Sequence, residues 1–119
     1  MEEINWNPEN CPVRTVLDRF GDKWSILVLS ILGEKHKLRF SEINREVGPD
    51  ISQKMLTVTL RTLEADGLIN RSVFPEVPPR VEYEITTLGK TLIPHINGLA
   101  NWAEENMQVI INSRERFAR

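Results

Sequence analysis

The stretch SQKMLTVTLRTLEADG, residues 52–67, carries the clearest helical pattern in the chain. Ser52 is a favoured N-cap residue, and Leu56, Leu60 and Leu63 recur at the spacing of one helix face. Asp66-Gly67 then ends the helix, because glycine is the usual residue just beyond a helix C-terminus. The stretch therefore predicts one helix whose leucine face is buried in a core.

The opposite face of this predicted helix is short, polar and basic. A helix turns by about 100° per residue, which places four residues away from the leucines: Lys54, Thr57, Val58 and Arg61. A solvated surface would explain them, but such a face also suits a helix that reads DNA base edges, with Arg61 reaching bases or phosphate. Ser52 and Gln53 lie at the helix start, where unpaired N–H groups favour a phosphate.

The periodicity changes after Gly67 from helical to alternating. Apolar and polar residues alternate over 69–73 and again over 81–85, which predicts the two strands of a hairpin. The loop between them, PEVPPR at residues 75–80, is stiffened by three prolines and ends in Arg80 at the predicted hairpin tip. Arg80 can belong to a solvated turn or enter the DNA minor groove as part of a wing, and we favour the wing.

Three helices are expected before residue 52. Pro12 suits the first position of a helix that stops at Gly21, and Asp22 can cap a second helix that runs through Leu32 and ends at Gly33. This second helix is apolar nearly all round, so we expect it at the centre of the fold. A short third helix is expected around residues 41–47. Arg39 and Ser41 at its start are weaker candidates for DNA contact.

A long helix is predicted over residues 87–119, capped by Thr86 or Thr87. It carries two apolar stripes, which is more than one small core can cover, so we expect it to form a dimer interface. The residues expected at this interface are Val13, Leu92, Ile96, Leu99, Trp102, Ala103 and Met107.

The order of elements predicts an α+β, mostly α fold: a winged helix-turn-helix with a two- or three-stranded wing sheet and terminal dimerisation helices. All 119 residues would form this single domain. Winged helices also serve as protein-interaction modules without DNA binding. That alternative would favour an acidic or apolar outer face on the helix over residues 53–65, whereas the observed face is basic.

Seven short motifs occur in order along the chain: CPV (11–13), GDKW (21–24), RFSEI (39–43), ISQKMLT (51–57), LRTLEADGLI (60–69), PPRVEY (78–83) and TTLG (86–89). Over about residues 11–103 the chain thus resembles the HxlR-type family of prokaryotic winged-helix transcription regulators, relatives of the MarR type. Asp22, where the family more often has glycine, and Ile85, where leucine is commoner, are small departures. The resemblance implies a homodimer with interlocking terminal helices, which presents two recognition helices and two wings to pseudo-palindromic double-stranded operator DNA.

Cys11 is the single cysteine, which excludes an internal disulfide and a multi-cysteine zinc site and fits a reducing compartment. A small buried residue is one interpretation. The resemblance implies another, because some HxlR-type members sense electrophiles or oxidants through a cysteine at this position. Unpaired N–H groups at a helix N-terminus stabilise a thiolate, and Arg14 could add to this. The product would be an adduct, a sulfenic acid or a disulfide to another molecule.

Composition limits the remaining function classes. A charged fraction of 27% and a net charge of −2 are typical of a globular domain, and no apolar run is long enough to cross a membrane. The start is acidic and has no apolar signal region, so we expect a cytoplasmic protein. Residues 35–80 hold 8 basic and 6 acidic residues, a local balance of +2.

No enzyme motif is apparent. His36 and His95 lie far apart in the sequence, and a metal site joining them to Cys11 is disfavoured. We therefore expect no catalytic residues, no metal and no cofactor. The sequence does not identify a small-molecule effector.

Overall fold

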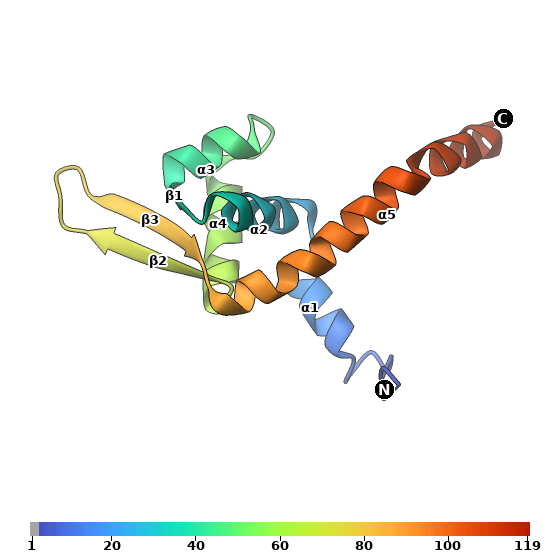
Figure 1. Ribbon diagram of the computed structural model, residues 1–119, viewed down its shortest axis with the longest axis horizontal. Coiled ribbons are helices and arrows are strands. Elements are labelled where there is room, and N and C mark those ends of the chain that lie inside the picture. Colours follow the sequence, from blue (N-terminus) through green and yellow to red (C-terminus); the bar gives the residue numbers. More distant parts are fainter. Residues whose placement is uncertain (1–2) are drawn as a thin grey trace.

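The computed structural model describes residues 3–119 and forms a winged helix-turn-helix with a long C-terminal helix (Figure 1). The elements follow the order α1 (Pro12–Phe20), α2 (Lys23–Lys35), β1 (Lys37–Arg39), α3 (Phe40–Val47), α4 (Gln53–Ala65), β2 (Ile69–Phe74), β3 (Arg80–Ile85) and α5 (Thr87–Ala118). The fold class predicted from the sequence is confirmed.

Helix starts coincide with the capping residues predicted from the sequence. Asp22 Oδ1 accepts hydrogen bonds from the Trp24 and Ser25 N–H groups at 3.0 and 2.9 Å. Ser52 Oγ accepts one from the Met55 N–H, and Thr86 Oγ1 accepts one from the Gly89 N–H. These bonds satisfy N–H groups that have no partner within the helix.

The end of α2 differs from the prediction. The helix passes through Gly33 to Lys35, and His36 closes it with φ at 71°. Gly33 instead allows α5 to approach α2, since a Cβ at this position would lie 2.9 Å from Ile93 Cδ1. The glycine is therefore explained by helix packing and not by helix termination.

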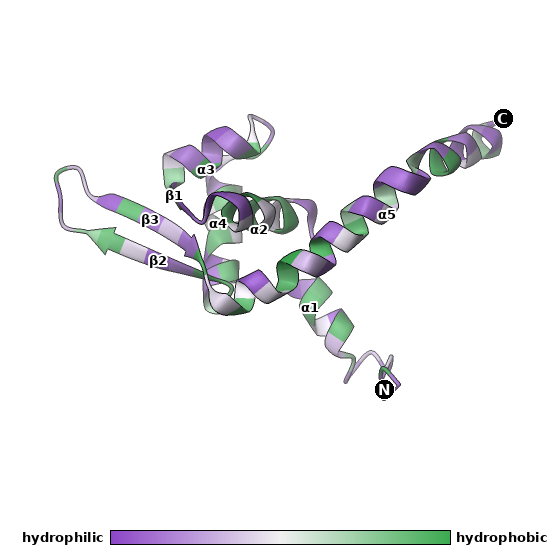
Figure 2. Ribbon diagram, in the orientation of Figure 1, coloured by the Kyte–Doolittle hydropathy of each residue, from purple (hydrophilic) through white to green (hydrophobic). Residues whose placement is uncertain are grey.

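The core forms around α2, as its apolar character predicts, and Figure 2 shows this hydrophobic segment in the centre of the molecule. Val28, Leu29 and Leu32 are fully buried there. The leucines of α4 are buried with them, Leu56, Leu60 and Leu63 being at most 1% exposed. The predicted orientation of α4 is confirmed.

The sheet has three antiparallel strands in the order β1-β3-β2. In the hairpin, Ile69 pairs with Ile85 near the core and Phe74 pairs with Arg80 at the far end. The short strand β1 adds to the other edge of β3, with Leu38 opposite Tyr83. Three residues are too few to show an alternating pattern, which is why the sequence left two or three strands open.

The helix α5 extends well beyond the body of the domain (Figure 1). Its first turns pack on α2, where Ile93 meets Gly33. Its later turns carry large apolar side chains into solvent, among them Leu99 (64% exposed) and Trp102 (56% exposed). Over residues 3–119 no helix has the length and apolar character needed to cross a membrane.

Candidate nucleic-acid interface

The outer face of α4 is open to solvent in the single chain. Lys54, Val58 and Arg61 are exposed, and Thr57 is half-buried. The Thr57 hydroxyl donates a 2.8 Å hydrogen bond to the Gln53 carbonyl, which leaves its oxygen able to accept from a ligand. Neither Lys54 nor Arg61 makes an ion pair with another residue of the described chain, so both charges are available to a partner.

The start of α4 presents a second set of polar groups. Ser52 and Gln53 are exposed, and Ser52 Oγ is occupied in the capping bond to Met55. The first N–H groups of a helix have no intrahelical acceptor and carry a partial positive charge. The position thus has the geometry for a phosphate, with Lys54 adjacent to it.

Arg71 is a basic residue of this face that the sequence reasoning missed. It lines a small hollow of about 160 Å³ between α4 and the hairpin, together with Thr57, Arg61, Glu64 and Tyr83. Strand alternation places Arg71 on the same side as the apolar Ile69 and Val73. The hairpin extends beyond the core, however, so that residues 70–73 of β2 are all exposed. Its pairing opposite Tyr83 brings Arg71 to the hollow that Arg61 also lines.

Arg80 does not stand at the hairpin tip as the sequence suggested. It is the first residue of β3 and pairs with Phe74, while the fully exposed Val77 lies in the loop that forms the tip. Its guanidinium lies 3.4 Å from Glu76 Oε1 and 3.8 Å from Glu82 Oε1, and its Cζ is 4.2 Å from the centre of the Phe74 ring. The arginine is therefore folded back on the wing, because two carboxylates and an aromatic face attract it.

The start of α3 faces the wing. Arg39 and Ser41 are exposed and line a groove of about 420 Å³ whose other wall is residues 76–81. The Arg39 N–H donates to Glu42 Oε1 at 2.8 Å, which caps the helix and leaves the guanidinium outside it. Arg39, Ser41 and Arg80 are thus brought together, whereas Arg61 belongs to the separate hollow beside α4.

Cys11 is the N-cap of α1 and is only 3% exposed. Its Sγ accepts a hydrogen bond from the Arg14 N–H at 3.4 Å. The Arg14 guanidinium instead pairs with Asp18 at 3.7 Å, so its charge is shared with a carboxylate and does not serve the sulfur alone. The thiol lies at the helix N-terminus, as its position before Pro12 predicts.

The residues expected at a dimer interface divide into three groups by exposure. Leu99, Trp102 and Met107 are exposed on α5, and Val13, Leu92 and Ala103 are half-buried. Ile96 differs from the expectation, because it is 8% exposed and belongs to the core of its own chain. The first turns of α5 serve the protomer, and the apolar surface begins after them.

Within residues 3–119, His, Cys, Asp and Glu side chains form no group of three that could hold a metal ion. His36 and His95 lie on different elements, the first at the end of α2 and the second on α5.

Comparison with known proteins agrees with this geometry. A family described as HxlR-like helix-turn-helix matches residues 19–110. A transcriptional regulator of helix-turn-helix type from Methanothermobacter thermautotrophicus is 54% identical over 94 residues, which are 79% of this chain and 70% of the relative.

Solved structures show the same likeness. The transcriptional regulator ytfH from Salmonella typhimurium superposes with a TM-score of 0.79 at 39% identity, over 95% of this chain and 99% of that one. The redox regulator HypR in its reduced form has a TM-score of 0.76 at 42% identity, over 85% of this chain and 98% of that one. Its oxidised form has a TM-score of 0.71 at 44% identity, over 81% of this chain and 97% of that one. These relatives are named as regulators and not as enzymes. The matching motifs, the winged helix-turn-helix and the family match over residues 19–110 together place this chain in the HxlR-like helix-turn-helix family.

Proposed function

We propose that this protein is a DNA-binding transcriptional regulator that acts as a homodimer on double-stranded operator DNA in the cytoplasm. The observation that carries the proposal is the outer face of α4, where Lys54 and Arg61 are exposed and unpaired on a helix anchored by buried leucines. A rigid helix with a basic, short-chained outer face fits the major groove of B-DNA. The regulators to which the chain is similar support the same function.

The residues of the interface take two kinds of role. Lys54, Thr57, Val58 and Arg61 lie where they would face base edges in the major groove. Ser52, Gln53, Arg39 and Ser41 lie at helix starts, which suits contact with the phosphate backbone. Arg71 adds a cation beside Arg61. Arg80 would approach DNA as part of the wing, although the nearby carboxylates of Glu76 and Glu82 offset its positive charge.

The dimer would form along α5. Leu99, Trp102 and Met107 leave apolar area in solvent that one chain does not cover. Burial of apolar surface is the main driving force of such association. A dimer would present two copies of α4, as a symmetric operator requires.

The alternative of a winged-helix protein-interaction module is less well supported. An acidic or apolar face on α4 would favour a protein partner, whereas the exposed positions of this helix include Lys54 and Arg61. The test that separates the two functions is direct binding to DNA.

The experiment compares Lys54→Ala and Arg61→Ala with wild type. Operator sites are first identified by genomic footprinting, and affinity is then measured by fluorescence anisotropy at one salt concentration. Arg61→Ala should cost about 1–3 kcal/mol if the arginine contacts a base. Lys90→Ala, which removes the same charge from an exposed position on α5, is the matched control. Unchanged affinity in both α4 variants, with unchanged thermal melting, would contradict the assignment of α4.

The position of Cys11 supports a second function, in which the protein responds to thiol-modifying compounds. We propose that modification of Cys11 weakens operator binding, because the sulfur caps α1 and an adduct would break the bond from Arg14. Similarity to the redox regulator HypR supports this proposal.

Operator binding by wild type and Cys11→Ser should be compared before and after diamide treatment. Serine keeps an N-cap oxygen, so the variant should fold normally. Loss of binding in wild type alone is the expected result. An equal loss in both proteins, or none, would leave Cys11 with a structural role.

A further inference from the structure

We propose that Arg19 is a positioning residue for operator binding, because its bidentate bond to Asp66 holds the end of α4 to α1 and fixes the angle at which α4 is presented. The two residues are 47 positions apart, Arg19 in the last turn of α1 and Asp66 at the C-cap of α4. The inference rests on the proposed function, since it concerns the helix to which DNA contact is assigned. In this role neither side chain touches DNA.

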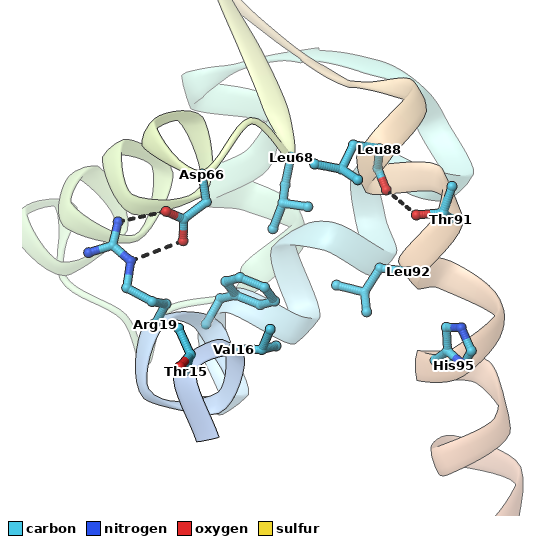
Figure 3. A pocket seen from close by; sticks show the side chains of 10 residues that line it. Thr15, Val16, Arg19, Asp66, Leu68, Leu88, Thr91, Leu92 and His95 are labelled. Carbon is cyan, nitrogen blue, oxygen red and sulfur yellow. Dashed lines mark hydrogen bonds and ion pairs between the residues drawn. The ribbon is translucent and has the colours of Figure 1, made fainter. Parts of the chain in front are cut away.

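The bond between Arg19 and Asp66 has a defined geometry. Arg19 Nε and Nη2 donate to the two carboxylate oxygens of Asp66 at 3.0 and 2.9 Å, and Figure 3 shows both bonds between α1 and the end of α4. The two side chains are 48% and 26% exposed. Most exposed ion pairs contribute little to stability, but two parallel bonds between an arginine and a carboxylate fix the relative orientation of the two groups.

The carboxylate of Asp66 lies where a helix by itself disfavours a negative charge. The C-terminus of a helix carries a partial negative charge, which cations in the last turn normally offset. The last turn of α4 contains no basic residue. Arg19 of α1 therefore supplies the cation at this end of α4, and the local charges favour the contact between the two helix ends.

Within its own chain, α1 is held by few other contacts. Phe20 is the buried residue of the helix, and a cavity of about 600 Å³ lies between α1, the turn after α4 and the start of α5. Across the described residues, 3–119, no other hydrogen bond or ion pair joins α1 to α4. The pair of Arg19 and Asp66 is therefore the directional contact between these two helices.

The same end of α4 is also attached to α5. The Thr86 hydroxyl donates to the Gly67 carbonyl at 2.7 Å, and the Thr86 N–H donates to the Leu68 carbonyl at 3.0 Å. Gly89 lies so close that a Cβ there would collide with the Leu68 carbonyl. The turn after α4 is thus fixed to the start of α5, and the bond to α1 adds a second attachment.

Two attachments on different elements restrict rotation of α4 about its C-terminal end. Buried leucines hold one face of the helix in the core, but apolar packing is not directional. The helix has 13 residues and is about 20 Å long, so a rotation by about 10° about this end would move the Lys54 end by about 3 Å. A binding site tolerates displacements of only about 0.5 Å. Loss of the pair should therefore weaken contact with the bases.

The experiment measures the affinity for footprinted operator DNA by fluorescence anisotropy at one salt concentration. Arg19→Ala should lower the affinity about 2- to 30-fold, the range for residues that couple two parts of a protein. Asp66→Ala should also lower it, although this change removes a negative charge and would strengthen binding if charge alone mattered. The double variant should lose no more than the larger single loss, because each substitution breaks the same bond. Opposite signs for the two single variants, or additive losses, would overturn the proposal.

Arg14→Ala is the matched control, because Arg14 lies on the same helix and pairs with Asp18 at 3.7 Å inside α1. It should bind operator as wild type does. An equal loss in this variant would attribute the effect of Arg19→Ala to net charge and overturn the proposal. Arg19→Lys keeps the charge without the two parallel donors, so its affinity should remain below that of wild type. Full recovery in Arg19→Lys would contradict the proposal as well.

Hydrogen exchange of the free protein tests the attachment without DNA. The amides of residues 60–68 should exchange faster in Arg19→Ala and Asp66→Ala than in wild type, while those of residues 24–32 in α2 should not change. Unchanged exchange at residues 60–68 would overturn the proposal, and so would an equal rise in both segments, which indicates general destabilisation. If wild type binds no operator, the proposed function fails, and the exchange data still decide whether the pair holds α4.

Discussion

Arg80 shows how a single residue can have the right chemistry and the wrong position. The sequence places a basic residue after three prolines, which resembles the tip of a DNA-binding wing. In the structure its guanidinium is held by Glu76, Glu82 and the ring of Phe74. These carboxylates and DNA phosphate would therefore compete for the guanidinium of Arg80.

The first prediction follows from that competition. Glu76→Gln should strengthen operator binding by about 0.2–1 kcal/mol, the usual range for an exposed ion pair, because it frees Arg80 and removes a repelling carboxylate. Anisotropy titration at low salt is the measurement. The same change in an Arg80→Ala background is the control, and an equal gain there would show that Arg80 itself does not contact DNA.

Asp22 is the second residue with a measurable role. Burial opposes its ionisation, but hydrogen bonds from the N–H groups of Ser25 and Trp24 and from the Ser25 hydroxyl outweigh burial and lower its pKa. The stabilisation is therefore complete above the unfolded value of about 3.9 and is lost as the pH falls through the lower folded value.

The second prediction is that Asp22→Ala lowers the free energy of unfolding by about 0.5–2 kcal/mol at neutral pH. Urea unfolding followed by circular dichroism measures this. Asp22→Asn keeps a capping oxygen but does not titrate, so its stability should fall less than that of wild type between about pH 5 and pH 2. Parallel pH profiles for the two proteins would contradict the role of the carboxylate.

At the scale of the element, α5 has two roles: its first turns complete the core of the protomer, and its later turns present the proposed dimer surface. Ile93 and Ile96 pack against the core of their own chain, whereas Leu99 and Trp102 point into solvent a few residues later. The exposure of the apolar side chains rises along α5 because the helix extends beyond the domain on which its first turns pack (Figure 1). Substitution of a buried residue in the first turns would therefore impair folding. Substitution of an exposed residue in the later turns tests dimer association alone.

The third prediction uses that division. Leu99→Asp should dissociate the dimer, because it places a charge in an apolar interface, and should leave the protomer folded, because Leu99 is 64% exposed there. Analytical ultracentrifugation gives the oligomeric state. Asn101→Asp adds the same charge at an exposed position nearby without removing apolar area, and it should remain dimeric. An intact dimer in Leu99→Asp would place the interface elsewhere.

At the scale of the whole molecule, a net charge of −2 hides a basic face. Lys54 and Arg61 on α4 and Arg71 on β2 lie on the side of the helix-turn-helix and its wing, and the later turns of α5 project in another direction (Figure 1). The acidic excess belongs mainly to residues 1–34, which hold 6 acidic and 3 basic residues, but Glu82 and Glu84 lie on the wing strand β3.

The fourth prediction is a steep dependence of operator affinity on salt, because phosphate contacts release counterions from DNA. Arg71→Ala should reduce the slope of log affinity against log salt by about one per subunit if it contacts phosphate. Arg114→Ala removes an equal charge from the far part of α5 and should leave the slope unchanged. A wild-type slope near zero would contradict the electrostatic basis of the interface.

The sequence alone determined the five helices, the two strands of the hairpin and the outer face of α4, whereas the short strand β1 was left open. Capping residues such as Asp22, Ser52 and Thr86 act on N–H groups within their own first turn, so their effect is local and readable. The leucine spacing of residues 56–63 likewise depends only on the pitch of one helix. The two strands of the hairpin follow from alternation in the same way.

Only the tertiary structure decided the contacts between residues far apart in the sequence. Arg71 lines the hollow beside Arg61 because β2 extends past the core, and position 33 within α2 requires a glycine because Ile93 of α5 packs against it. The bond between Arg19 and Asp66 joins positions 47 residues apart, and the cavity beside it is built from three elements. Such contacts depend on the direction in which each element leaves the core, and no periodicity within a single element encodes that direction.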